Sequence, residues 1–231
     1  MPGGDCMTPR PRNPAEIPHF PTLACELELW GRGFTRLAGL DEAGRGAWAG
    51  PVAAGAVILP PDPAVLGHLA GVRDSKQMTP RARAEWARRI RENAVAWGVG
   101  MADSEEIDAI GILPATRLAM RRALEKLSPA PQHLLIDALR LPGIALPQTA
   151  IIHGDACALS IAAASVLAKT ARDDLMEGMD VVFPEYGFSR HKGYGTRVHQ
   201  AALAELGPCP HHRRSFAPVR ARLAQDEPDA E

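Results

Sequence analysis

The sequence has few lysines, no closely paired cysteines and no long apolar run. It contains four lysines beside 22 arginines. Its four cysteines, which show no CxxC spacing, are Cys6, Cys25, Cys157 and Cys209. Neither a zinc site nor a disulfide framework is predicted from them. The longest apolar-rich run, residues 156–168, is too short to cross a bilayer, and residues 1–20 lack a signal-peptide core. We therefore expect a cytoplasmic protein with no membrane partner.

Net charge is also nearly absent, at −1 over 231 residues, which excludes a globally basic protein. A local basic surface remains compatible with nucleic-acid binding. Apolar residues make up 46% and charged residues 23%, values typical of a globular chain rather than a disordered one. The arginine excess suits bidentate contacts with phosphate, although a biased genomic composition explains it equally well.

The chain divides into three predicted segments. Residues 1–22 are rich in proline and are expected to be a mobile leader. Residues 23–222 form one predicted compact domain, whose C-terminal part, about 184–222, is expected to be helical and basic. Residues 223–231 are expected to be a frayed acidic tail.

Apolar periodicity and turn residues predict alternating strands and helices within that domain. Strands are predicted at 37–41, 52–59, 95–102, 134–137 and 150–153, and helices at 23–31, 80–93, 114–127, 156–176 and 196–206. Thr79 and Pro80 suit the start of the second helix. The order of elements predicts an α/β sheet flanked by helices.

Carboxylates stand at the ends of three apolar strands. Asp41 and Glu42 run into a glycine-rich turn, Asp137 ends a second strand, and Asp155 follows a third. Sites in open α/β sheets are built at strand ends. Converging carboxylates stay ionised only around a cation, and an all-oxygen set favours Mg²⁺ or Mn²⁺. Two such ions catalyse phosphoryl transfer. A helix cap, a turn or a surface charge is the alternative for each residue alone.

Asp41 and Glu42 pose a geometric problem. Successive residues of a regular strand point to opposite faces, so both reach one metal site only under special conditions. Either the strand breaks there, for which Gly44 is suited, or one residue acts through water or its backbone carbonyl.

Two further segments favour nucleic-acid contact. The turn Gly44-Arg45-Gly46 allows backbone amides to approach a ligand, although an ordinary hairpin turn has the same pattern. From Tyr186 to Arg222 there are seven Arg or Lys residues, four His and one Glu, interleaved with aromatics. These aromatics are Tyr186, Phe188, Tyr194 and Phe216. Such a stretch binds phosphates and stacks on sugars or bases, or else forms a solvated face. The Cys209-Pro210-His211-His212 run has no second ligand pair, so zinc is not favoured.

Taken together, these motifs resemble those of the bacterial ribonuclease HII family over residues 23–219. The matching segments, in order, are Leu40–Gly46 with Gly50–Val52, Asp74-Ser75-Lys76, Leu135–Asp137, Gly154-Asp155, Ala163–Lys169, Arg172-Asp173, Tyr186–Phe188, His191–Thr196 and His211–Phe216. Such an ordered set is far more specific than any single motif.

The resemblance implies a ribonuclease H-like fold, with a mixed central sheet and a C-terminal helical extension. It implies an endonuclease that hydrolyses RNA in RNA–DNA hybrids and nicks 5′ of single ribonucleotides in duplex DNA. The products would carry 3′-OH and 5′-phosphate. Its acidic residues fall on Asp41, Glu42, Asp137 and Asp155, of which the first three match metal ligands and the last helps hold a second Mn²⁺ or Mg²⁺.

Substrate contacts are implied as well. Gly44, Arg45 and Gly46 match the loop that reads the ribose 2′-OH, and Tyr194 matches the tyrosine that packs on the neighbouring deoxyribose. The candidates for contacts with the nucleic-acid backbone are Arg45, Lys169, Lys192 and Arg213.

Three residues depart from the family pattern, and we expect none to abolish activity. His153 replaces a usual Lys, Ala138 a frequent Gly and Ala47 a frequent Pro. The resemblance implies no obligatory protein partner, and a monomer is the default. Two alternative functions remain. One is a nuclease of the same fold that needs a run of ribonucleotides, and the other is a non-catalytic protein that binds hybrids.

Overall fold

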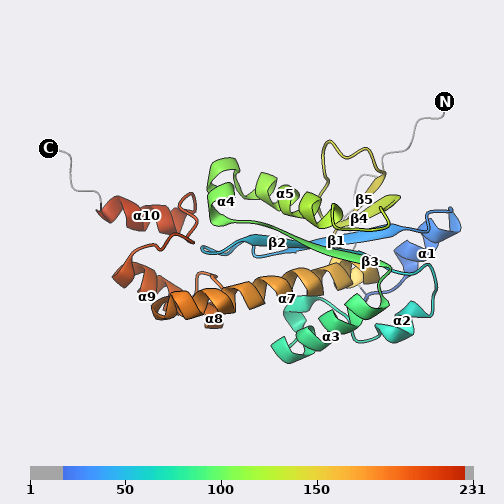
Figure 1. Cartoon of the computed structure of the whole chain (residues 1–231), viewed down its shortest axis with the longest axis horizontal. Coiled ribbons are helices and arrows are strands. Elements are labelled where there is room, and N and C mark those ends of the chain that lie inside the picture. Colours follow the sequence, from blue (N-terminus) through green and yellow to red (C-terminus); the bar gives the residue numbers. More distant parts are fainter. Residues whose placement is uncertain (1–17, 227–231) are drawn as a thin grey trace.

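Residues 18–226, which the computed structural model describes, form a five-stranded sheet between layers of helices (Figure 1). The strands are β1 (Leu37–Ala43), β2 (Val52–Ile58), β3 (Ala96–Ala102), β4 (His133–Asp137) and β5 (Gln148–Ile151). Their order is β3-β2-β1-β4-β5. The β1-β2 and β2-β3 pairs are antiparallel, whereas β1-β4 and β4-β5 are parallel. The mixed sheet implied by the resemblance is confirmed.

Helices cover both faces of this sheet and gather at one end of it (Figure 1). They are α1 (Ala24–Gly31), α2 (Val65–His68), α3 (Pro80–Asn93), α4 (Ser104–Ile110), α5 (Ile112–Leu124), α6 (Gly154–Cys157), α7 (Leu159–Val182), α8 (Phe188–His191), α9 (Arg197–Leu206) and α10 (Ala217–Asp226), with 3₁₀ turns η2 (Ser75–Gln77) and η3 (Pro184–Tyr186). Helix α5 packs on one face, and α7 with α3 on the other. Within residues 18–226, no helix is sufficiently long and apolar to span a membrane.

Local chemistry accounts for several boundaries. Thr79 accepts a hydrogen bond from the amide of Ala82, and Pro80 opens α3, both as predicted. Helix α4 was not predicted, although Asp103 and Glu106 form a capping box at its start. This short signal is visible in the sequence beside the apolar pattern of β3.

The predicted helix over 156–176 is divided in two. Ala158 has an extended backbone between α6 and α7, and α7 continues to Val182. The new helix starts at this point because Glu26 accepts hydrogen bonds from the amide and the hydroxyl of Ser160, at 2.9 and 2.7 Å. A carboxylate at a helix N-terminus satisfies amides that have no partner within the helix. The buried Glu26 of α1 thereby fixes where α7 begins.

The ends of the chain are described only in part. Residues 1–17 of the predicted leader and 227–231 of the predicted tail lie outside the described residues. Residues 223–226 belong to α10, so helix replaces the fraying expected for this part.

Helix α7 lies unusually close to the sheet, because glycines face it from β1 and β2. A Cβ atom on Gly39 would lie 2.2 Å from the carbonyl carbon of Ser160, and one on Gly55 2.2 Å from the carbonyl oxygen of Ala164. Backbone rather than a flexible side chain occupies both positions. The helix therefore has one permitted depth against the sheet.

We expect Gly39→Ala to lower the free energy of unfolding by about 1–3 kcal/mol, because the added methyl group overlaps the α7 backbone. The control is Gly178→Ala on the exposed side of α7, where no atom lies within 4 Å of the added Cβ. There the free energy of unfolding should rise by about 0.5–1 kcal/mol. Urea unfolding monitored by circular dichroism measures both, and a neutral Gly39→Ala would contradict the close packing.

Candidate active site

The predicted carboxylates gather at one edge of the sheet. Asp41 and Glu42 lie near the end of β1, and Asp137 ends the neighbouring parallel strand β4. Asp155 lies in the short helix α6. The amide of Gly154 donates a 2.7 Å hydrogen bond to Asp137 Oδ1, which ties the start of α6 to the end of β4. Three separate segments therefore deliver carboxylates to one place.

Asp41 is the most deeply buried of the four, at 4% exposure. Burial raises its pKa well above the ordinary value, and repulsion by Glu42, Asp137 and Asp155 adds to the rise. A hydrogen bond from the Ser165 hydroxyl acts in the opposite direction. The ionised form of Asp41 is thus costly without a nearby cation.

The other three carboxylates share this environment. Burial is the largest cause of the raised pKa of Glu42, Asp137 and Asp155. For Asp137 the pKa rises to about 6, and repulsion by Asp155 and Glu42 contributes. Arg45 opposes the rise at Glu42, with its Nη1 atom 3.2 Å from Glu42 Oε1.

The donor set fits a hard divalent cation. It consists of carboxylate oxygens, which Mg²⁺ and Mn²⁺ prefer, and the groups repel one another without one. As the side chains stand, no three His, Cys, Asp or Glu residues within 18–226 are arranged to hold a metal ion. Binding would therefore draw these four carboxylates closer together.

Strand β1 does not break between Asp41 and Glu42. Its pairing with β2 continues through both residues to Ala43, and the positive φ of 92° occurs at Gly44. Asp41 contacts the α7 side, and Glu42 leaves the opposite face of the strand. The strand break that would let both side chains reach one metal ion is therefore absent. The remaining possibility is that one of the two residues contacts the ion through water or its backbone carbonyl.

Lys76 lies beside the acidic cluster, although no role was predicted for it. Its Nζ is 3.8 Å from Asp155 Oδ2, and its side chain is 76% exposed. Burial lowers its pKa, but the surrounding carboxylates Asp74, Asp155, Asp41 and Asp137 outweigh this and raise it. The scarcity of lysine and the Asp74-Ser75-Lys76 motif are the sequence features that could have identified Lys76 as a site residue.

The glycine-rich turn presents exposed backbone next to the cluster. Arg45 and Gly46 are exposed, and nothing lies within 4 Å of a Cβ atom built on Gly46. Gly44 is buried, and a Cβ there would lie 2.0 Å from Arg172 Nε. The turn therefore packs on Arg172 at Gly44 and is open to solvent at Arg45 and Gly46.

The three departures from the family pattern lie at or next to turns or bends, and only that at Ala47 is explained by a local contact. The amide of Ala47 donates to the carbonyl of Gly44, a bond that proline would lack. Ala138 has a φ of 50°, a strained value that glycine adopts freely. His153 has a φ of 55° and precedes α6, which also ends β5 earlier than predicted.

Two buried arginines support the turn. Arg172 donates to the carbonyls of Ala49, Pro51 and Lys192, at 3.1, 2.8 and 2.9 Å. Arg213 donates to the carbonyls of Arg45 and Gly50, both at 2.9 Å. Both side chains are at 0% exposure. Burial lowers the pKa of Arg172, and it lowers that of Arg213 to about 9, with repulsion from Arg172 adding to the effect.

This burial corrects the expected role of Arg213. Because its guanidinium faces backbone carbonyls inside the protein, it holds the turn in place and does not present itself to a phosphate at the surface. Arg172 was overlooked as a site residue. Its position in α7, a mostly apolar helix, is the sequence feature that could have identified it.

Tyr194 is half-buried above a group of basic side chains. Lys169 Nζ and the Arg172 guanidinium lie 5.7 and 5.5 Å from its ring centre. Lys169 also pairs with Asp173 at 2.5 Å, and Lys192 pairs with Glu177 at 2.6 Å. Both predicted lysine contacts are therefore already bound to carboxylates, which a phosphate would have to replace.

The basic C-terminal stretch is only partly a surface. Tyr186 and Phe188 are buried and stack at 5.3 Å, so the expectation that they stack on nucleic acid is wrong. They form a small core with residues of α7 and α9 instead. The exposed cations of this stretch are Arg190, Arg197, Arg214 and Arg220.

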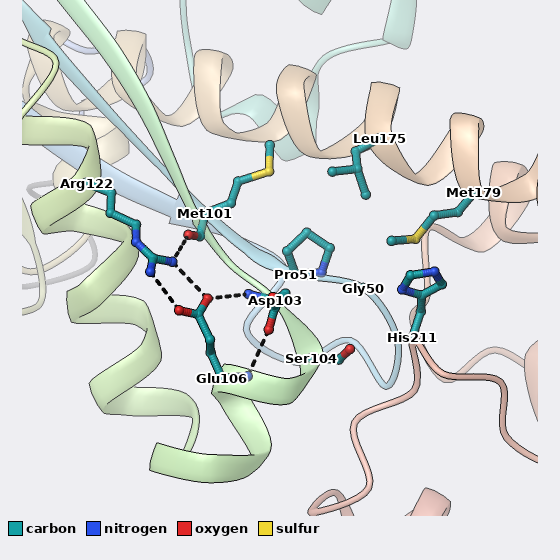
Figure 2. Close-up of a pocket in the computed structure, with 10 residues that line it drawn as sticks. All are labelled: Gly50, Pro51, Met101, Asp103, Ser104, Glu106, Arg122, Leu175, Met179 and His211. Carbon is teal, nitrogen blue, oxygen red and sulfur yellow. Dashed lines mark hydrogen bonds and ion pairs between the residues drawn. The ribbon is translucent and has the colours of Figure 1, made fainter.

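A pocket lined in part by Gly50 and Pro51 does not contain the predicted carboxylates. Figure 2 shows its lining residues, which are Gly50, Pro51, Met101, Asp103, Ser104, Glu106, Arg122, Leu175, Met179 and His211. Arg122 and Glu106 in this pocket pair with each other, with Arg122 Nη2 2.7 Å from Glu106 Oε1. The acidic edge of the sheet, rather than this pocket, is the candidate active site.

Comparison with known proteins gives consistent matches. The family model described as "Ribonuclease HII" matches residues 38–219. A ribonuclease HII of Chloroflexus aurantiacus is 56% identical over 203 residues, covering 87% of this chain and 95% of the relative. The ribonuclease H2 structure from Pyrococcus horikoshii OT3 superposes with a TM-score of 0.67 at 26% identity, covering 82% of this chain and 98% of that one. Bst-RNase HIII in complex with Mn²⁺ has the same fold, with a TM-score of 0.62 at 21% identity, covering 82% of this chain and 70% of that one.

Without metal, we expect stability to depend on pH through Asp137. The folded chain keeps the Asp137 proton up to a pKa of about 6, whereas the unfolded chain releases it near 3.8. Stability is therefore lost as the pH rises between these values, by about 1–3 kcal/mol. Relative to the native chain, Asp137→Asn should gain stability over this range in EDTA, measured by urea unfolding. Asp174→Asn, at an exposed position on α7, is the control. Parallel pH profiles for all three proteins would contradict the interpretation.

Proposed function

The chain belongs to the ribonuclease HII family and is an endonuclease acting on RNA–DNA hybrids, and we propose that its reaction takes place at the acidic edge of the sheet. In this proposal Asp41, Glu42 and Asp137 hold Mg²⁺ or Mn²⁺, and Asp155 helps to hold a second ion. The observation that carries it is the convergence of four mutually repelling carboxylates, two buried and two half-buried, at the ends of neighbouring segments.

The metal requirement follows from this charge. The Mn²⁺ complex of Bst-RNase HIII, a protein of the same fold, supports a metal site of this kind here. When bound, the two ions would activate a water and stabilise the leaving oxygen of the phosphodiester. Asp41 is held for this task by its contacts with the Glu42 amide and with Ser165. Gly154 orients Asp137 in the same way.

We further propose that the enzyme recognises single ribonucleotides in duplex DNA and cleaves on their 5′ side, leaving 3′-OH and 5′-phosphate. The exposed backbone of Arg45 and Gly46 is suited to the ribose 2′-OH, which distinguishes RNA from DNA. Gly44 belongs to the same turn, and because it has no side chain the turn packs directly on Arg172. Tyr194 would pack on the neighbouring deoxyribose.

Basic side chains around this site would contact phosphates. Lys76 reaches the acidic cluster from solvent, and Lys169 and Lys192 border Tyr194 and the turn. Such contacts supply affinity and salt dependence rather than base specificity. Because its proposed substrate is duplex DNA that contains ribonucleotides, we place the activity in the cytoplasm. The proposal requires no protein partner, and it treats the chain as a monomer.

Cleavage of a labelled DNA duplex containing one ribonucleotide tests this function. We expect a nick 5′ of the ribonucleotide with Mg²⁺ or Mn²⁺ and none with EDTA. Asp41→Asn should reduce the rate by at least about 100-fold, because it removes a charge from the metal site. Asp174→Asn, which changes an exposed carboxylate on α7, should leave the rate unchanged.

Two results would contradict parts of the proposal. Cleavage of a long hybrid without nicking at the single ribonucleotide would show that a run of ribonucleotides is needed, and would remove the proposed roles of the turn and Tyr194. Full activity of Asp41→Asn would show that the acidic edge is not the reaction site.

A further inference from the structure

Three buried histidines lie together beneath the Gly193-Tyr194 segment. His191 ends α8, His199 lies in α9, and His212 precedes α10. Their exposures are 7%, 0% and 1%. The rings of His191 and His199 stack with centres 4.3 Å apart, and those of His199 and His212 lie 5.2 Å apart. The proposed reaction makes no direct use of any of them.

Hydrogen bonds fix the position of the proton on two of these rings. The amide of Cys209 donates to His212 Nδ1 at 3.0 Å, so this nitrogen is an acceptor and the His212 proton is on Nε2. His212 Nε2 lies 3.0 Å from His199 Nε2 and donates to it. The His199 proton is therefore on Nδ1, which donates to the carbonyl of Tyr194 at 3.0 Å.

The third ring is determined in the same way. The amide of Gly193 donates to His191 Nδ1 at 3.2 Å, which makes that nitrogen an acceptor. The proton is then on His191 Nε2, and it donates to the carbonyl of Tyr186 at 2.8 Å. All six ring nitrogens have partners when the three rings are neutral.

This network holds the Gly193-Tyr194 segment at two points. His191 accepts from the amide of Gly193, and His199 donates to the carbonyl of Tyr194. The carbonyl of Gly193 accepts from the amides of Trp48 and Ala49, at 2.7 and 3.4 Å. The backbone of Tyr194 is thereby fixed relative to the turn that carries Arg45 and Gly46.

Electrostatics agrees with neutral rings. Burial lowers the pKa of His199 and His212 to about 4, and repulsion by a neighbouring histidine adds to the effect at each. Burial also lowers the pKa of His191, against the opposing field of Asp180. The Cys209 thiol next to His212 has a raised pKa and remains protonated.

We propose that His199, with its proton placed by His212, is a positioning residue for Tyr194 and thereby for recognition of a single ribonucleotide. The proposal rests on the proposed function, in which Tyr194 packs on the deoxyribose next to that ribonucleotide. His199 acts through the Tyr194 backbone and does not touch substrate. A long hybrid has no deoxyribose at that position in the cleaved strand, so its cleavage depends less on His199.

Two substitutions of His199 separate its two hydrogen bonds. In His199→Asn the side-chain amide nitrogen replaces Nδ1 and can still donate to the Tyr194 carbonyl, but the bond from His212 is lost. In His199→Gln the side-chain oxygen replaces the Nε2 acceptor and keeps the bond from His212, but the Tyr194 carbonyl loses the His199 donor and keeps the amide of Thr196, at 2.8 Å. Of the native groups, only the His212 Nε2–H in His199→Asn is left without a partner, so a merely structural role predicts a defect in His199→Asn at least as large as in His199→Gln.

The measurement is kcat and KM on a duplex with one ribonucleotide and on a long hybrid, with Tm recorded for each protein. For His199→Gln we expect kcat/KM on the single-ribonucleotide duplex to fall by about tenfold or more, and to change by less than about threefold on the long hybrid. For His199→Asn we expect changes below about threefold on both substrates.

Nitrogen-15 NMR of the native chain reads the tautomers directly. At pH 6 we expect His199 as the Nδ1-protonated neutral form, and His191 and His212 as the Nε2-protonated forms. A charged ring, or an Nε2 proton on His199, would overturn the network. This result does not depend on activity.

The kinetic outcomes distinguish a failure of the proposed function from a failure of the positioning role of His199. A native enzyme that does not nick the single-ribonucleotide duplex contradicts the proposed function. A native enzyme that nicks it contradicts only the positioning role if His199→Asn loses at least as much activity as His199→Gln, or if neither variant loses any.

Discussion

The backbone of α7 rests directly on β1 and β2, because Gly39 and Gly55 have no side chains to separate them. This contact sets the position of every residue that α7 contributes to the site. Ser165 reaches Asp41, and about two turns later Arg172 reaches the glycine-rich turn. A helix at another depth would misplace the acidic cluster and the turn together.

The site encloses four carboxylates and two buried guanidinium groups, and no ion pair joins those carboxylates to either guanidinium. Four carboxylates repel one another at the edge of the sheet, whereas Arg172 and Arg213 are satisfied largely by backbone carbonyls beneath the turn. Buried carboxylates of this kind favour a divalent cation. Buried guanidinium groups that donate to carbonyls make a rigid support for the turn. The proposed function uses both, with chemistry at the acidic edge and recognition on the supported turn.

Local sequence signals predicted most of the sheet and the four carboxylates. Strand ends are marked by apolar runs followed by Asp or Glu, and Thr79-Pro80 marks a helix start, so these features depend on near neighbours. The resemblance supplied the mixed topology and the substrate, which the periodicity did not specify. The structure confirmed that topology and divided the long helix at Ala158.

Burial was what the sequence could not provide. Arg213, Tyr186 and Phe188 have the composition of a nucleic-acid surface, but contacts from distant segments enclose all three. The hydrogen bond between Ser160 and Glu26 likewise joins residues far apart in the sequence. The three histidines that lie together, His191, His199 and His212, share no periodicity. Such side chains acquire their roles only when the fold brings the partners together.

The central claim, that the four carboxylates form a divalent-cation site, is tested most directly by anomalous diffraction from crystals grown with Mn²⁺. We predict a manganese peak bound by oxygens of Asp41, Glu42 and Asp137, with Asp155 beside it. Manganese bound only elsewhere on the protein, with these carboxylates still apart, would contradict the account.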